Sequence, residues 1–159
     1  MKINDFLLRM WNDYSDLNPH INKVLDLIKE KESKTIINDH IALRTFNHKK
    51  INRHVLSSYF VKNGYKPIED LTFTEKKLKA TYYLHSDPTL PRIFISELLL
   101  ENFSEKLQKS INNKIDEIDV NSISDPEFLT SGIPWSPIDY KTYKEIQSES
   151  DYASWVLAM

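Results

Sequence analysis

The chain has 159 residues and a mass of 18.8 kDa, which is the length of about one domain with a substantial hydrophobic core. Hydrophobic residues make up 40% and charged residues 28%, and the mean hydropathy is −0.49, so we expect a folded, water-soluble protein. The 21 basic and 23 acidic residues give a net charge of −2, which lacks the basic excess of nucleic-acid-binding proteins.

Two residue counts exclude whole classes of site. The absence of cysteine removes disulfides, thiolate metal sites and cysteine nucleophiles, so any metal must be held by His, Asp or Glu. The only two glycines, Gly64 and Gly132, cannot build a Walker loop or a dinucleotide-binding fingerprint. Asp5 interrupts the apolar start of the chain, and no segment approaches the roughly 18 apolar residues that cross a bilayer. We therefore expect a cytoplasmic protein without a membrane partner.

Two helices are predicted at the N-terminus. The apolar face of the first consists of Phe6, Leu7, Met10 and Trp11. Asn18-Pro19 is a typical helix start, and the second helix extends from there to about Lys31. Its apolar face consists of Ile21, Val24, Leu25 and Ile28.

The hydrophobic period then changes from helix to strand. After the apolar Thr35-Ile36-Ile37, the pattern predicts a strand over 38–46 and a helix over 51–63 that ends at Asn63-Gly64. Three further strands are predicted at 65–68, 78–84 and 92–100. The predicted order is therefore strand, helix, strand, strand, strand, in one sheet with the helix packed on it.

Helical spacing resumes after Leu100 and is followed by a polar connection over 112–137 and two short helices over 140–146 and 152–159. The last helix reaches Met159 without a cap or a polar tail. Because chain ends are usually polar and frayed, we expect the sequence to be the front part of a longer protein. The three tryptophans, Trp11, Trp135 and Trp155, are interpreted as packing residues.

The segment 38–46 carries the first candidate site. Side chains alternate along a strand, so His40, Ala42 and Arg44 share one face, and His40 and Arg44 lie about 13 Å apart with a small residue between them. Imidazole is a common ligand for iron and zinc, and guanidinium binds carboxylates bidentately. A metal at one end and a carboxylate at the other would fit. The same residues are also typical of an ordinary half-exposed strand whose charges are paired locally.

Glu97 is the second candidate, because it lies within an otherwise apolar predicted strand. A carboxylate there needs a partner, which could be a metal or Arg44. The alternative is a glutamate at the end of a strand that reaches water. Asp39 is a poorer ligand candidate, because regular strand alternation points it away from His40.

Four segments in chain order resemble the 2-oxoadipate dioxygenase/decarboxylase family. They are Asn-Asp-His-Ile-Ala-Leu-Arg-Thr-Phe at 38–46, Glu-Lys-Lys-Leu-Lys-Ala at 75–80, Pro-Arg-Ile-Phe-Ile-Ser-Glu-Leu at 91–98 and Tyr-Ala-Ser-Trp-Val-Leu-Ala at 152–158. The resemblance implies an α+β fold, in which a βαβββ module like that of the vicinal oxygen chelate superfamily, with a mixed four-stranded sheet, is flanked by helices. It divides the chain into N-terminal helices (1–34), the module (35–100) and a C-terminal helical segment (101–159) that leads to a second module.

The activity that the resemblance implies is iron(II)-dependent conversion of 2-oxoadipate and O₂ to 2-hydroxyglutarate and CO₂, a step of lysine catabolism. His40 corresponds to the family's first histidine ligand, and Arg44 corresponds to the arginine that binds a substrate carboxylate. No catalytic residue is implied beyond the ligands of the metal and of the substrate, which is a small 2-oxo dicarboxylic acid.

The sequence departs from the family pattern at its end. The second histidine and the ligating carboxylate of the family come from the second module, and this chain stops before both. Glu97 occupies the position that corresponds by pseudo-symmetry to the carboxylate ligand, so it is the other candidate ligand here. Fe(II) is therefore expected only for the complete site, which a homodimer or a partner chain could provide. The alternative is a non-catalytic module that kept the scaffold and binds a small ligand or a protein.

Overall fold

The computed structural model describes residues 1–31 and 38–158. Its centre is a four-stranded sheet of order β1-β4-β3-β2, in which β1 and β4 are parallel and the other pairs are antiparallel. The strands are β1 (His40–Phe46), β2 (Lys66–Phe73), β3 (Leu78–Leu84) and β4 (Arg92–Leu98). The α-helices are α1 (Ile3–Leu17), α2 (His20–Lys31), α3 (Arg53–Lys62), α4 (Glu105–Asp116), α5 (Tyr140–Gln147) and α6 (Asp151–Ala158). Short 3₁₀ turns lie at Leu100–Asn102 (η1), Ser122–Ser124 (η2) and Pro126–Thr130 (η3).

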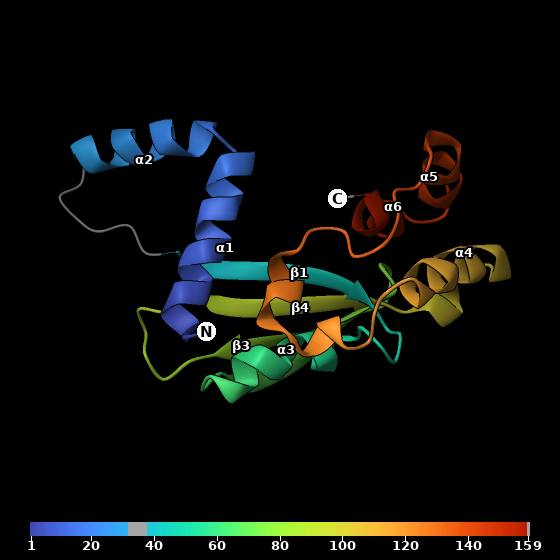
Figure 1. Ribbon diagram of the computed structural model, residues 1–159, viewed down its shortest axis with the longest axis horizontal. Coiled ribbons are helices and arrows are strands. Elements are labelled where there is room, and N and C mark those ends of the chain that lie inside the picture. Colours follow the sequence, from blue (N-terminus) through green and yellow to red (C-terminus); the bar gives the residue numbers. More distant parts are fainter. Residues whose placement is uncertain (32–37, 159) are drawn as a thin grey trace.

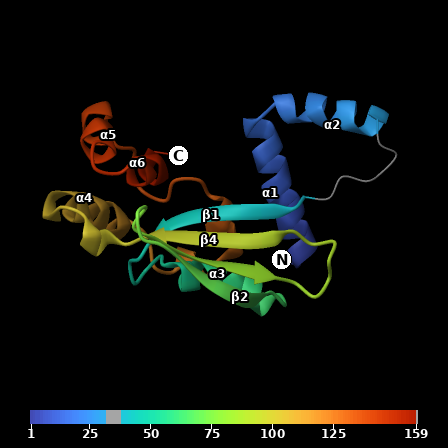
Figure 2. The ribbon, with the colours of Figure 1, turned by 180° about the vertical axis from the view of Figure 1, so that it is seen from behind.

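One face of the sheet is covered by α3, by the first half of α1 and by η3. Figure 1 views the molecule from this side, and Figure 2 shows the sheet from behind, with its strands in front of these helices. The covered face forms a hydrophobic core with the helices, and its buried members are Phe6, Leu7, Leu56, Phe60, Tyr65, Tyr83, Ile93 and Ile95. The opposite face is largely free of helices in Figure 2.

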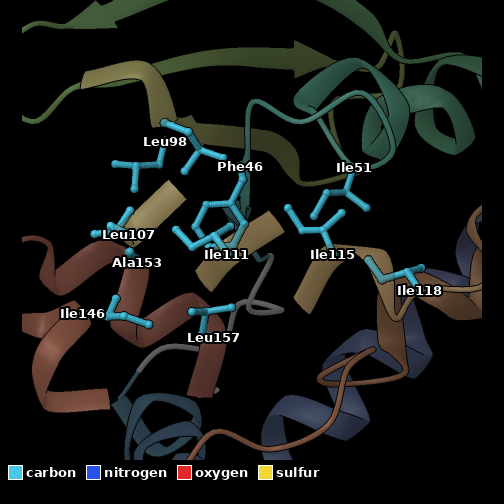
Figure 3. Close-up of a cluster of buried hydrophobic side chains, with 11 residues drawn as sticks. Phe46, Ile51, Leu98, Leu107, Ile111, Ile115, Ile118, Ile146, Ala153 and Leu157 are labelled. Atoms are coloured by element: carbon cyan, nitrogen blue, oxygen red, sulfur yellow. The ribbon is translucent and has the colours of Figure 1, made fainter. Parts of the chain in front are cut away.

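A second core lies at the carboxyl ends of β1 and β4. There Phe46 and Leu98 meet α4, α5 and α6, and Figure 3 shows their side chains packed together. The helical residues of this core are Leu107, Ile111, Ile115, Ile146, Ala153 and Leu157. This packing places α6 beside the carboxyl end of β1, close to the candidate residue Arg44.

The predicted α+β architecture is confirmed, including the strand, helix, strand, strand, strand order. Asn52 caps α3 by accepting hydrogen bonds from the backbone of His54 and Val55. The predicted helix end is also confirmed, since Gly64 has a φ of +95° and a Cβ there would meet the His85 ring. Within the described residues, no helix is long and apolar enough to cross a membrane. The apolar run at 35–37 and the expected boundary at 34/35 lie outside the described residues.

One predicted strand is too short. The second strand is predicted at 65–68 but extends to Phe73, because β2 is an edge strand whose residues are nearly all exposed and therefore lack an apolar alternation. The apolar face predicted for the first helix ends at Trp11, and α1 continues to Leu17 through mostly exposed residues. Hydrophobic periodicity reports burial, so it does not detect the exposed parts of either element.

A buried ion pair joins α3 to the sheet. The guanidinium of Arg53 forms an ion pair with the carboxylate of Glu97, and the Arg53 backbone N–H donates to the same carboxylate over 2.9 Å. The two side chains are only 11% and 6% exposed. The Arg53 Nε also donates to the Thr81 hydroxyl over 2.9 Å, so one side chain connects the first turn of α3 with both β3 and β4.

We predict that Arg53→Ala destabilises the fold by about 3–5 kcal/mol, because it leaves the buried Glu97 carboxylate without its counter-charge. Urea denaturation followed by circular dichroism measures this change. The matched control is Arg9→Ala, which breaks the exposed Arg9–Glu127 ion pair of 2.9 Å and should cost no more than about 1 kcal/mol. Equal losses in the two variants would contradict the prediction.

Candidate functional site

The uncovered side of the sheet, called here the open face, is hollowed by a cavity of about 700 Å³. The parallel pairing of β1 and β4 places His40 beside Arg92 and Ala42 beside Phe94. The cavity is lined by Asp39, His40, Ala42, Arg44, Leu71, Tyr82, Leu84, Arg92 and Phe94. The structure thus places His40, Ala42 and Arg44 on one face, as the alternation of the strand predicted.

His40 is exposed and is held by its neighbour. The Asp39 carboxylate lies 3.0 Å from Nδ1 of the His40 ring. Because a carboxylate only accepts hydrogen bonds, Nδ1 is the donor, and in the neutral ring Nε2 keeps its lone pair. The hydrogen bond from His40, followed by the charge of Arg92, lowers the pKa of Asp39 below its usual value. Asp39 precedes β1, so the expectation that it points away from His40 is wrong.

Arg44 stacks on a tryptophan of the last helix. Its guanidinium carbon lies 4.7 Å from the centre of the Trp155 ring, in the geometry of a cation–π contact. Trp155 is 45% exposed, so this face of α6 is not part of the core. Stacking restrains the guanidinium plane while leaving its N–H groups free to bind an anion.

Tyr152 attaches α6 to the sheet next to Arg44. Its hydroxyl donates to the Ser96 carbonyl oxygen over 2.9 Å and accepts from the Thr45 backbone N–H over 3.2 Å. Burial raises the pKa of the Tyr152 phenol to about 12. A phenol that is buried, neutral and bonded to two strands fixes the position of Trp155 one turn further along the helix.

Glu97 does not join this site. It pairs in register with Thr45, so its side chain lies on the covered face, opposite to that of His40 and Arg44. Both of its carboxylate oxygens are bonded to Arg53. The interpretation of Glu97 as a metal ligand, or as a partner of Arg44, is therefore corrected: Arg53 satisfies this carboxylate inside the protein.

The described residues do not make an iron site by themselves. Among residues 1–31 and 38–158, no group of three His, Cys, Asp or Glu side chains could hold a metal ion. Of the residues that the structure describes, His40 supplies the only imidazole in the cavity lining, and Asp39 already accepts a hydrogen bond from it. A two-histidine, one-carboxylate iron site needs two more ligands than this face supplies.

Three residues of the site were not identified from the sequence. Arg92 appears only within the motif 91–98, and its place beside His40 depends on the parallel register of β1 and β4. Trp155 and Tyr152 reach the site from a helix more than 100 positions away along the chain. Spacing within one segment cannot predict such contacts, although the presence of all three in segments shared with one family was a usable signal.

The chain matches the sequence profile of the 2-oxoadipate dioxygenase/decarboxylase family over residues 6–131. It is 33% identical over 157 residues to the chloroplastic/amyloplastic 2-oxoadipate dioxygenase/decarboxylase of Oryza sativa subsp. japonica, and 29% identical to the chloroplastic enzyme of that name from Arabidopsis thaliana. Each alignment covers 91% of this chain but only 43% and 42% of the respective relative. The chain therefore spans less than half the length of these curated relatives.

Solved structures agree with this match. A Shewanella frigidimarina protein assigned as a hydrolase superposes with a TM-score of 0.91 at 42% identity, over 98% of this chain and 60% of that one. The Oryza sativa hydroxyglutarate synthase in complex with 2-oxoadipate superposes with a TM-score of 0.88 at 31% identity, over 97% of this chain and 53% of that one. A Ralstonia eutropha protein assigned to the glyoxalase superfamily shares only the fold, with a TM-score of 0.72 at 15% identity over 96% of this chain and 57% of its own.

We predict that Tyr152→Phe lowers the free energy of unfolding by about 1–2 kcal/mol at neutral pH, because it removes the hydroxyl's hydrogen bonds to two strands. It should also change the alkaline response. The folded-state pKa of about 12 lies above the ordinary value of 10, so the wild type keeps this contribution below pH 10 and loses it as the pH rises through 12.

Urea denaturation at a series of pH values from neutral to strongly alkaline tests this prediction. The variant should lose less stability than the wild type above pH 10, although Tyr65, whose pKa is also raised to about 12, keeps part of the slope. Identical alkaline slopes would show that Tyr152 is not the buried phenol responsible.

Proposed function

Because this chain belongs to the 2-oxoadipate dioxygenase/decarboxylase family, we propose that it forms one half of an iron(II)-dependent active site that converts 2-oxoadipate and O₂ to 2-hydroxyglutarate and CO₂. The observation that carries the proposal is the open face, where His40 and Arg44 emerge on the same side with only Ala42 between them. In this proposal His40 supplies one metal ligand, and Arg44 binds the substrate carboxylate far from the reacting carbon.

The spacing of these two residues supports the proposal. They lie about 13 Å apart along the strand, and a six-carbon diacid bound near His40 can reach Arg44 with its far carboxylate. Asp39 supports the role of His40, because a carboxylate that accepts from Nδ1 directs Nε2 towards a ligand and fixes the ring. The Oryza sativa relative was solved in complex with 2-oxoadipate, which supports the same class of substrate here.

We further propose that the site is completed from outside the described residues. The face supplies one imidazole ligand, so iron(II) would require a histidine and a carboxylate from a further module, a second copy or a partner chain. The relatives are about twice as long as this chain, which supports a further module as the source. The metal is thus proposed for the complete site only.

A second candidate function is a non-catalytic module that binds a small anion or a protein. The observation that favours it is the pairing of Glu97 with Arg53, because among the described residues it leaves only Asp39 beside His40, and that carboxylate is already hydrogen-bonded to the His40 ring. A module of this kind would keep Arg44 and the scaffold but would not need His40. The two candidates therefore differ in what His40 does.

We expect the isolated chain to show no enzyme-like turnover of 2-oxoadipate, because two of the three expected ligands are missing. The measurement is O₂ consumption and 2-hydroxyglutarate formation by pure protein reconstituted with Fe(II). Addition of a partner chain or module that supplies the missing ligands should restore turnover to the range of about 1–10³ s⁻¹. Iron-dependent turnover in this range by the chain alone would contradict the partial-site proposal.

In an assembled active enzyme, Arg44→Ala should weaken productive binding of 2-oxoadipate by about 2–5 kcal/mol, because it removes one partner of a charge pair. The monocarboxylate 2-oxohexanoate should lose much less, since it never uses that contact. His40→Ala should abolish metal-dependent turnover of both substrates. Measurement of kcat/KM for the two substrates checks these expectations, with Arg9→Ala as the control arginine variant.

Equal losses for both substrates in Arg44→Ala would show that Arg44 is structural. If the chain has no turnover and its His40→Ala variant still binds 2-oxoadipate as the wild type does, the non-catalytic module is favoured instead.

A further inference from the structure

The chain contains four arginines, and they fall into two pairs with different surroundings. Arg9 forms an ion pair with Glu127, and Arg53 forms ion pairs with Glu97 and Asp70. Within the described ranges, the guanidinium groups of Arg44 and Arg92 form no ion pair and no hydrogen bond. Both of these unpaired arginines lie on the open face and line the same cavity.

The surroundings of Arg44 and Arg92 favour an anionic ligand. Among the described residues, Asp39 is the only carboxylate that lines the cavity; it accepts a hydrogen bond from His40, and the charge of Arg92 acts on it without a direct ion pair. The rest of the lining is apolar or aromatic: Ala42, Leu71, Tyr82, Leu84 and Phe94. Two guanidinium charges against one carboxylate leave this hollow with a positive charge over an apolar floor, which attracts and focuses anions.

The spacing of the two arginines selects a length of ligand. Arg92 is the register partner of His40, and Arg44 lies four residues further along β1, so the two Cα atoms are about 13 Å apart along the strands. An extended six-carbon diacid has about 6 Å between its carboxyl carbons. A bidentate guanidinium–carboxylate pair adds about 4 Å at each end. A diacid held in this way spans about 14 Å from one guanidinium carbon to the other. Two arginines whose Cα atoms lie about 13 Å apart, with side chains that project from the same face, can present their guanidinium groups at that separation.

We propose that Arg92 is a second carboxylate-binding residue, and that Arg92 and Arg44 together hold a short-chain dicarboxylic acid by its two ends. The proposal rests on the proposed function and deepens it, because Arg92 would hold the carboxylate nearest to His40. It requires no metal, since guanidinium–carboxylate pairing supplies the contact at both ends. The arginines thus select substrates by length and by charge before any chemistry takes place.

The test is calorimetric titration of the metal-free 159-residue chain, in the presence of a chelator, with adipate as the probe. Adipate has the six carbons and two carboxylates of the proposed ligand class and no 2-oxo group with which to chelate a metal. We expect measurable binding that weakens as the salt concentration rises. Arg92→Gln and Arg44→Gln should each reduce adipate affinity by about 10-fold, because each removes one charged contact.

The matched control is Arg9→Gln, which removes an arginine of the same charge from an exposed site that does not line the cavity. Its adipate affinity should equal that of the wild type. Hexanoate, a monoacid of the same length, should bind the wild type about as weakly as adipate binds Arg92→Gln. If Arg92→Gln does not fold, as judged by circular dichroism, Arg92→Lys replaces it, and its loss should be smaller because charge remains while bidentate geometry is lost.

Three results would overturn the proposal: no adipate binding by the wild type, equal affinities for adipate and hexanoate, or an Arg92→Gln affinity that equals the wild-type value. These results concern binding by the metal-free chain, whereas the proposed function is tested separately, by turnover of the assembled enzyme and by the effect of Arg44→Ala on kcat/KM. Conversely, if the assembled enzyme does not turn over 2-oxoadipate but the 159-residue chain binds adipate, the enzymatic proposal is overturned and the two-arginine site remains.

Discussion

The buried ion pair between Arg53 and Glu97 determines which side of the sheet can hold a ligand. Because strand side chains alternate, turning Glu97 inward to Arg53 turns Arg92, Phe94 and Ser96 outward. Residues that pair in the parallel register of β1 and β4 point to the same face, so His40, Ala42 and Arg44 of β1 also face outward. A slip of one residue in β4 would place the Glu97 carboxylate on the open face, leave Arg53 without its partner and turn Arg92 into the core. The ion pair therefore specifies the site as well as attaching α3.

The other constraint acts at the carboxyl end of β1, where the second hydrophobic core holds α6 against the sheet. Ala153 and Leu157 are buried in that core. Trp155 lies on another side of the same helix, which is turned towards β1. The Tyr152 hydroxyl forms hydrogen bonds with β1 and β4, and Trp155 stacks on Arg44. The arginine is thus oriented by a helix whose own position is set by apolar packing some distance away. Loss of that packing would disorder the guanidinium without removing it.

The sequence allowed the prediction of the sheet, of α3 and of the shared face of His40 and Arg44, because each depends on periodicity within one segment. Glu97 was misassigned because its partner, Arg53, comes from another element, and only the tertiary structure shows that the two meet. Arg92 was missed because its place beside His40 depends on strand register. The length of β2 was underestimated because an exposed edge strand has no apolar face to detect. Local sequence patterns therefore predicted the helices and strands, whereas the contacts between these elements required the three-dimensional structure.

The open face bears on what the proposed site could bind and on what it would still need for catalysis. A guanidinium–carboxylate contact exposed to water is weakened by the high dielectric constant, so binding on this face alone should be modest. Under the proposed function, reaction with O₂ would need ligands that the described residues do not supply and a site from which water is excluded. The further ligands and the exclusion of water are both needed on the same side of the sheet, since His40 and Arg44 face outward there. A single element that covered this face and carried the missing ligands would provide both, and it would strengthen the contacts of Arg44 and Arg92 by lowering the dielectric constant around them.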